Sequence, residues 1–96
     1  MKEPFITKNL DVSTAHITKE DSELLNQKRI QNLLIVYPYR EGYFIYVPEY
    51  DLTQLKKTGF SKAFINLMKQ TAKAGCKYLQ LDCDGMTYDD LPTYNW

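Results

Sequence analysis

The sequence predicts an α+β fold, an antiparallel sheet of about four strands with helices packed on one face. Strand-like and helix-like hydrophobic patterns follow one another in the order β-α-β-β-α-β, which is the split βαβ pattern of ferredoxin-like folds. The chain has 96 residues, of which 44% are hydrophobic, so it can hold one core. We therefore expect a single domain over residues 1–96, with a loose segment at 1–8.

Four stretches are predicted to be strands, because they alternate between apolar and polar residues or are rich in β-branched and aromatic residues. They cover about residues 10–14, 33–37, 43–47 and 78–83. The middle two are expected to form an antiparallel hairpin, since Arg40-Glu41-Gly42 is a three-residue turn with glycine where a positive φ is usual. The last strand carries Leu79, Leu81 and Cys83 on one face, and Tyr78, Gln80 and Asp82 on the other.

Three helices are predicted from their start signals and their periodicity. Thr18 with Asp21 matches a capping box, so the first helix is expected to begin there. Asp51 is a cap for a short helix over 52–57. The main helix follows over 61–74, with an apolar stripe at 3.6-residue spacing and lysines on the opposite face.

The stretch after the last strand predicts a turn and an aromatic tail. Asp84-Gly85 stops the strand, because glycine tolerates a positive φ and aspartate caps turns. Four large apolar side chains then follow within nine residues: Tyr88, Leu91, Tyr94 and Trp96. Chain ends usually fray unless they dock, so we expect residues 88–96 to be packed on the domain.

Charge and cysteine content restrict the class of protein. Lys plus Arg and Asp plus Glu number 12 each, and this balance argues against a nucleic-acid partner while leaving a local basic patch open. Cys76 and Cys83 are too far apart along an extended strand for a disulfide, so we expect two reduced thiols. No apolar run suits a signal peptide or a membrane span. These features predict a cytoplasmic protein without a membrane partner.

Several short motifs resemble those of a known family. They are Ser13-Thr14-Ala15-His16-Ile17, the hairpin run from Gly42 to Glu49, Asp82-x-Asp84-Gly85, and Asp90-Leu91-Pro92-x-Tyr94-x-Trp96. Over about residues 10–96 the chain resembles an uncharacterised bacterial domain family that is commonly encoded on plasmids and other mobile elements, often near antirestriction or replication accessory genes. This resemblance implies a compartment and a genetic setting. It implies no chemistry and no catalytic residue.

His16, Asp82 and Asp84 are weak candidates for an acid–base or metal site. An EF-hand-type loop would need an oxygen ligand where Met86 stands, so the structural interpretation is favoured: Asp84 caps the turn and His16 bonds a nearby turn. In a plain split βαβ sheet the first and last strands are antiparallel, which would separate His16 from Asp82. The extra helix at 52–57 could instead make these strands parallel and bring the residues together. No cofactor or metal is predicted.

The hairpin carries a cluster of aromatic residues that we predict to be a binding surface: Tyr37, Tyr39, Tyr43, Phe44 and Tyr46. Alternation requires that half of these rings face the core. Rings on a sheet can stack bases, but such faces come with a basic surround, and only Arg40 is near. The sequence therefore predicts a small non-catalytic binding or accessory module that contacts a protein partner or a second copy. The alternative is a metal-dependent enzyme using His16 with Asp82 and Asp84.

Overall fold

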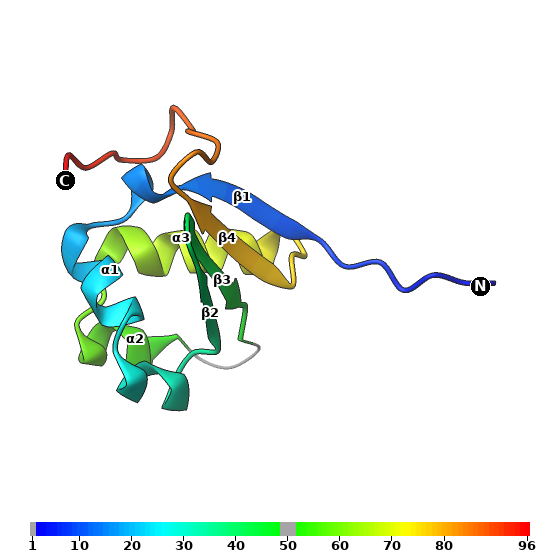
Figure 1. Ribbon diagram of the computed structural model, residues 1–96, viewed down its shortest axis with the longest axis horizontal. Helices are drawn as coiled ribbons and strands as arrows, with labels where there is room; N and C mark the ends of the chain where they lie inside the picture. The colour runs from blue at the N-terminus through cyan, green and yellow to red at the C-terminus, as the bar shows by residue number, and fades with distance from the viewer. Residues whose placement is uncertain (1, 49–51) are drawn as a thin grey trace.

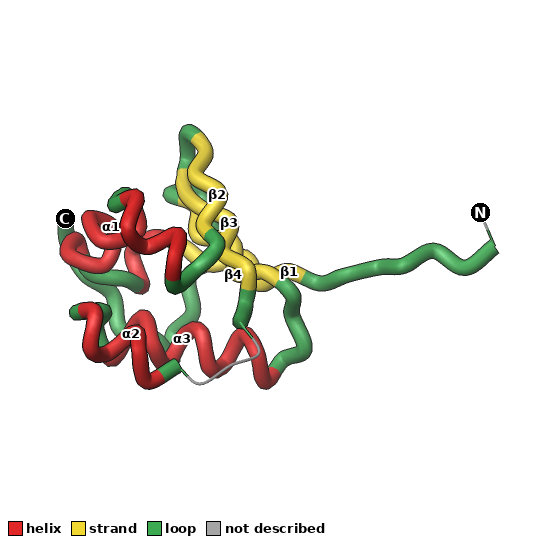
Figure 2. The backbone as a smooth tube through the Cα atoms, turned by 90° about the horizontal axis from the view of Figure 1, so that it is seen from below, coloured by secondary structure: helices red, strands yellow, loops and turns green. Residues whose placement is uncertain are grey.

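The computed structural model describes residues 2–48 and 52–96, in which a four-stranded sheet is covered by helices on one side (Figures 1 and 2). The α+β class is therefore confirmed. The expected cap Asp51 and the motif residue Glu49 lie outside the described residues. The elements, with two 3-10 helices labelled η, are in chain order β1 (Asn9–Ser13), η1 (Thr14–His16), α1 (Lys19–Leu25), η2 (Lys28–Asn32), β2 (Val36–Tyr39), β3 (Gly42–Tyr46), α2 (Thr53–Thr58), α3 (Lys62–Lys73) and β4 (Tyr78–Asp82).

The sheet has the strand order β1-β4-β3-β2 and is mixed, so the predicted antiparallel sheet is wrong. β4 lies antiparallel to β3 but parallel to β1, with Leu10 opposite Leu79 and Val12 opposite Leu81. The extra helix explains this direction. After β3 the chain passes through α2 back to Ser61, whose N–H donates to Asp21 at 2.8 Å near the start of α1. α3 then runs back along the sheet, and β4 enters between β1 and β3 in the direction of β1.

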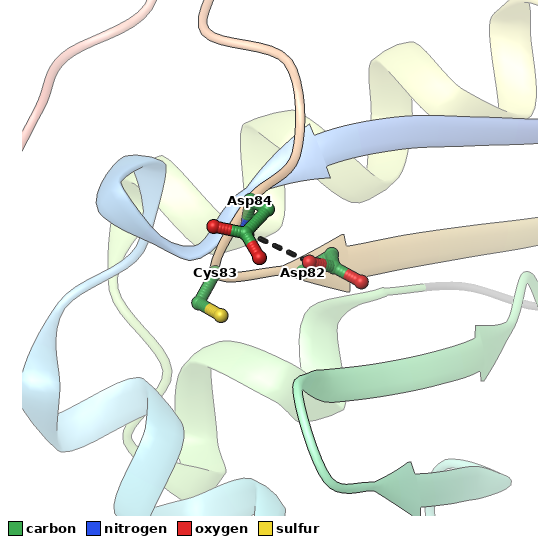
Figure 3. Close-up of side chains that lie close together, drawn as sticks. All are labelled: Asp82, Cys83 and Asp84. Atoms are coloured by element: carbon green, nitrogen blue, oxygen red, sulfur yellow. Dashed lines mark hydrogen bonds between the residues drawn. The ribbon is translucent and has the colours of Figure 1, made fainter.

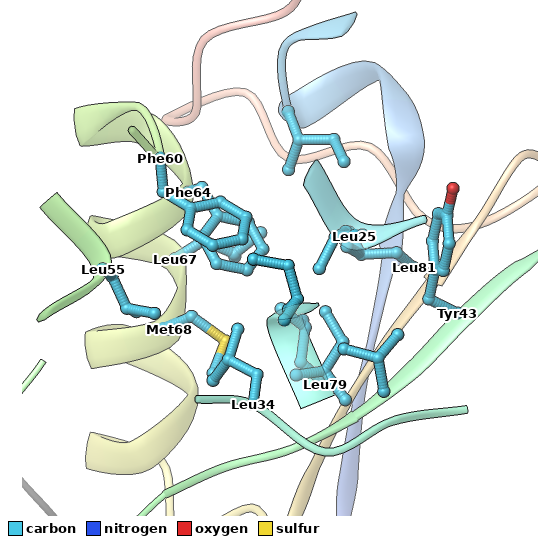
Figure 4. Packing of buried hydrophobic residues seen from close by; sticks show 14 of the residues in the cluster. Leu25, Leu34, Tyr43, Leu55, Phe60, Phe64, Leu67, Met68, Leu79 and Leu81 are labelled. Carbon is cyan, nitrogen blue, oxygen red and sulfur yellow. The ribbon is translucent and has the colours of Figure 1, made fainter. Parts of the chain in front are cut away.

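The core lies between the inner face of the sheet and the helices (Figure 4). On the helix side, α3 buries Phe64, Leu67, Met68 and Thr71, as its amphipathic pattern predicts, and Phe64 stacks on Phe60 with ring centroids 4.5 Å apart. On the sheet side, alternating residues of the strands belong to the same core cluster: Val12, Val36, Tyr43, Ile45, Leu79 and Leu81. Among the described residues, no helix lies over the opposite face of the sheet (Figure 2). This uncovered surface is called the open face below.

Side-chain caps begin two of the helices, α1 at the predicted residue Thr18 and α3 at Ser61, for which no cap was predicted. Thr18 and Asp21 form a complete capping box, in which each side chain accepts the other's backbone N–H at 3.0 Å. Ser61 caps α3 by accepting the N–H of Phe64 at 3.1 Å. Asp21 also receives the Ser61 N–H and hydroxyl, so one buried carboxylate joins the starts of α1 and α3.

The hairpin differs from its predicted form in two ways. The first of its strands begins later, at Val36, and continues through Pro38 to Tyr39. Pro38 is tolerated because β2 is an edge strand. The expectation of a positive φ at Gly42 is wrong, because among the described glycines only Gly59 and Gly75 have one. Gly42 is required for another reason: a Cβ there would overlap the carbonyl oxygen of Leu81 in β4.

Candidate functional site

The open face combines aromatic and polar side chains from all four strands. Strand alternation places on it the residues whose neighbours in sequence enter the core: Asn9, Asp11, Tyr37, Tyr39, Phe44, Tyr46, Tyr78, Gln80 and Asp82. Tyr37 is 54% exposed, and Ile35, just before β2, is 46% exposed. Ile35 and Tyr46 also line a hollow of about 330 Å³ at the margin of this face.

The polar residues of the open face form a continuous hydrogen-bonded chain. Asn9 Nδ2 donates to Gln80 Oε1 at 2.8 Å, and Gln80 Nε2 donates to the Tyr39 hydroxyl at 3.3 Å. That hydroxyl donates to Asp82 Oδ2 at 2.6 Å. Tyr39 reaches Asp82 across β3, where Gly42 is the residue between them in the register and has no side chain in the way. This hydrogen-bonded chain of side chains thus links β1 and β2, the outermost strands of the sheet, through β4.

The rings of the open face pack against one another beside this chain. Tyr39 contacts Phe44 with centroids 5.4 Å apart, and Tyr46 meets Tyr78 edge-on at 5.8 Å. Such paired rings are stiff, because each restricts the rotation of the other. Tyr78 was not among the predicted binding residues, although alternation in the last strand had placed it on the outer face.

Tyr43, in contrast, lies in the core on the opposite face of β3. Its hydroxyl donates to Asn26 Oδ1 at 3.0 Å and lies 3.1 Å from Ser22 Oγ. Of the five aromatic residues predicted to bind, the structure therefore brings four together on the open face: Tyr37, Tyr39, Phe44 and Tyr46. The fifth ties α1 to the sheet.

Within the part of the chain that the structure describes, one group of side chains has the composition of a metal site, and it lies at the end of β4 and in the following turn (Figure 3). Ligand atoms of Asp82, Cys83 and Asp84 lie within 4.8 Å of one another. Both oxygens of Asp82 are already engaged, Oδ2 by Tyr39 and Oδ1 by the Asp84 N–H at 2.8 Å. Desolvation, followed by the nearby charges of Asp84 and Asp82, raises the pKa of the Cys83 thiol. The geometry is that of a turn cap, but the carboxylate that caps the turn is that of Asp82 and not, as predicted, that of Asp84.

His16 is almost fully buried, at 2% exposure, and both of its ring nitrogens are used. Nε2 accepts the backbone N–H of Tyr88 at 2.9 Å, and Nδ1 donates to the carbonyl oxygen of Pro92 at 2.7 Å. These partners define the neutral tautomer with the proton on Nδ1. The parallel β1–β4 pair does bring His16 to the same end of the sheet as Asp82, but His16 is outside the cluster of Asp82, Cys83 and Asp84. Its ring holds the tail instead.

The tail from Tyr88 to Trp96 lies beside η1 (Figure 1). The Tyr94 N–H donates to the Ala15 carbonyl oxygen at 2.8 Å, and the Trp96 indole N–H donates to that of Ile17 at 2.9 Å. Tyr94 and Trp96 nevertheless remain 37% and 54% exposed. Tyr88 and Leu91, earlier in the tail, are partly buried and pack against the core. The tail is therefore held both by this packing and by its hydrogen bonds, those to His16 included.

The Tyr39–Asp82 hydrogen bond predicts a measurable titration. Tyr39, followed by the Asp84 N–H, holds the pKa of Asp82 below its ordinary value. Burial, followed by the bond to Asp82, raises the pKa of Tyr39 above its ordinary value. The stabilising bond is thus lost as the pH falls through the folded-state pKa of Asp82, and also as it rises through that of Tyr39.

We expect Tyr39→Phe to raise the pKa of Asp82, measured by NMR titration of its carboxyl carbon. Tyr46→Phe, on the same face without a contact to Asp82, is the control and should leave that pKa unchanged. An unaltered Asp82 titration in the Tyr39 variant would show that the hydroxyl does not stabilise the carboxylate.

The fold and this face define a small α+β domain with one helix-covered and one open, aromatic side of a mixed sheet. A family model matches residues 9–96, and the chain belongs to that family, described as the C-terminal domain of a family of unknown function (DUF5983). The resemblance to an uncharacterised family is thereby confirmed. No curated protein and no solved structure shows a significant match. Among the described residues, no helix is long and apolar enough to cross a membrane.

Proposed function

We propose that this domain is a non-catalytic binding module whose open face docks a protein partner. The observation that carries the proposal is the uncovered side of the sheet, where five rings lie together: Tyr37, Tyr39, Phe44, Tyr46 and Tyr78. Tyrosine and phenylalanine are enriched in protein interfaces, because they bury large areas with few rotatable bonds. Two pairs among them, Tyr39 with Phe44 and Tyr46 with Tyr78, are in ring contact, which limits the side-chain freedom that these four rings can lose on binding.

The chemistry of the open face favours protein over nucleic acid. The charged side chains that its strands carry, Asp11 and Asp82, are acidic and would repel phosphate. One cation lies beside them: the Nζ of Lys77 is 5.6 Å from the ring centroid of Tyr78. Arg40 lies at the hairpin turn, where its Nε is 3.9 Å from Glu41. The polar chain from Asn9 to Asp82 is already hydrogen-bonded within the face, so a partner can cover it without leaving those groups unpaired.

The edges of the sheet are less suited to a partner than its face. The β1 edge is covered at Asp11, whose carbonyl accepts the Tyr88 hydroxyl at 2.9 Å, and at Ser13, whose N–H donates to the Met86 carbonyl oxygen at 2.7 Å. On the β2 edge, the Val36 carbonyl accepts Gln31 Nε2 at 3.1 Å. These contacts occupy groups that strand addition would need.

The alternative function, a metal-dependent enzyme, has less support. Both ring nitrogens of His16 form hydrogen bonds with the tail. The two carboxylate oxygens of Asp82 accept hydrogen bonds from Tyr39 and from the Asp84 N–H.

We further propose a bacterial, cytoplasmic setting and a role accessory to a mobile element. The support for this setting is the resemblance of the terminal motif, Asp90-Leu91-Pro92-x-Tyr94-x-Trp96, together with the content of reduced thiols.

The test compares proteins that co-purify with the tagged domain from its source cell. Ile35→Ser with Tyr37→Ser removes the two most exposed apolar groups of the open face, and we expect at least about a tenfold loss of the bound partner, as for central interface residues. Phe5→Ser with Ile6→Ser is the matched control, since both are exposed and precede β1. Partners that bind both double variants equally, or no partner sensitive to the open face, would contradict the proposal.

A further inference from the structure

The balanced net charge of the chain conceals a strong segregation of charge along it. Residues 52–81 contain no Asp or Glu and six lysines: Lys56, Lys57, Lys62, Lys69, Lys73 and Lys77. Residues 82–90 contain no Lys or Arg and four aspartates: Asp82, Asp84, Asp89 and Asp90. Opposite charges of this density attract each other between molecules when they lie on different surfaces.

The basic stretch forms a groove between α2 and α3. Lys56, Lys62 and Lys69 line it together with the apolar side chains of Leu52 and Ile65, and its volume is about 270 Å³. The helical spacing of positions 62, 65 and 69 places these α3 residues on one face. Within residues 2–48 and 52–96 the one ion pair joins Arg40 to Glu41, so no carboxylate lies within 4.0 Å of the three groove lysines. The groove is thus apolar and basic, and no carboxylate of the described residues forms an ion pair with its lysines.

The acidic stretch forms an exposed loop with the complementary character. Asp84, Asp89 and Asp90 are exposed, and Met86 between them is 58% exposed. The loop has a defined shape, because the Met86 carbonyl accepts the Ser13 N–H and the Tyr88 N–H donates to His16. An exposed, flexible thioether among carboxylates suits an apolar groove surrounded by lysines.

We propose that the acidic loop at 84–90 of one molecule docks in the α2–α3 groove of a second copy. Met86 would cover Leu52 and Ile65, while the aspartates would pair with Lys56, Lys62 and Lys69. The loop and α2 lie on opposite sides of the molecule, as Figure 1 shows, so one copy cannot satisfy its own groove. The contact is therefore head-to-tail, and it extends into chains of molecules instead of closing into a symmetric dimer.

The test is sedimentation equilibrium of the full chain with two complementary variants. For the wild type we expect the average mass to rise with concentration at low salt and to return to that of the monomer at about 0.5 M salt, since exposed ion pairs are screened. Lys62→Gln with Lys69→Gln removes the groove charges, and Asp89→Asn with Asp90→Asn removes those of the loop. Each double variant alone should associate at least about tenfold more weakly.

Mixing the two double variants is the decisive step. One keeps an intact loop and the other an intact groove, so the mixture should form a 1:1 complex that stops at the dimer. Lys19→Gln with Lys28→Gln, two exposed lysines outside the groove, is the control and should associate like the wild type.

Three results would overturn the head-to-tail contact: a monomer at every concentration in low salt, association that neither double variant weakens, or a mixture that remains monomeric. A monomer that binds a 20-base-pair DNA duplex through Lys62 and Lys69 would also overturn it, in favour of nucleic acid. If Ile35→Ser with Tyr37→Ser abolishes self-association while the groove variant does not, the open face is the contact between copies and the groove is not.

Discussion

Asp21→Ala is expected to lower the free energy of unfolding by about 3–5 kcal/mol, because it leaves several buried donors without an acceptor. The carboxylate is fully buried and accepts the N–H of Thr18 at 3.0 Å, the N–H of Ser61 at 2.8 Å and the Ser61 hydroxyl at 2.5 Å. Both the start of α1 and the start of α3 lose their connection in this variant. Total stability of a domain of this size is about 5–14 kcal/mol, so the loss is a large fraction of it.

Urea denaturation followed by circular dichroism measures this loss. The slope of the free energy of unfolding against urea concentration should stay unchanged, which would indicate that the substitution alters stability alone. Asp21→Asn should lose less, since its amide oxygen can still accept one of the N–H groups. Glu23→Ala, an exposed acid on the same helix, should change stability by no more than about 0.5 kcal/mol. A loss below about 1 kcal/mol in Asp21→Ala would show that the buried carboxylate does not join the two helices.

His16→Ala is expected to release the tail and to lower the free energy of unfolding by about 2–4 kcal/mol. The substitution empties a buried site and leaves the Tyr88 N–H and the Pro92 carbonyl without their partner. Hydrogen exchange gives the specific signature: the amides of Tyr88 and Tyr94 should exchange at least about tenfold faster, because the tail opens locally.

Trp96→Ala separates the role of the histidine from that of the ring at the end of the tail. The indole is half exposed and makes one hydrogen bond, so we expect a loss of about 1 kcal/mol or less and an unchanged Tyr88 amide. If His16→Ala left the exchange of Tyr88 and Tyr94 at the wild-type rate, the tail would be held by contacts other than the ring nitrogens of His16.

Local features of this protein were predictable from the sequence, because their signals lie within a few residues. The Thr18–Asp21 capping box, the buried stripe of α3 and the two faces of β4 all follow from spacing. The same holds for part of the candidate site. Four of the five predicted rings do lie on the open face, but the expectation that half of them face the core is wrong, since only Tyr43 does.

Contacts between distant residues were decided by the tertiary structure. Parallel pairing of β1 with β4 depends on the path of the chain through α2 and α3. The short helix predicted at 52–57 left this pairing open as an alternative, but no local pattern decided it. His16 has its partners 72 and 76 residues away, so its role could not be inferred from its neighbours. Charge segregation was readable in the sequence, whereas the groove between α2 and α3 exists only once the helices pack. Local structure follows from steric and hydrogen-bonding rules over a few residues, but a site depends on which distant surfaces the core brings together.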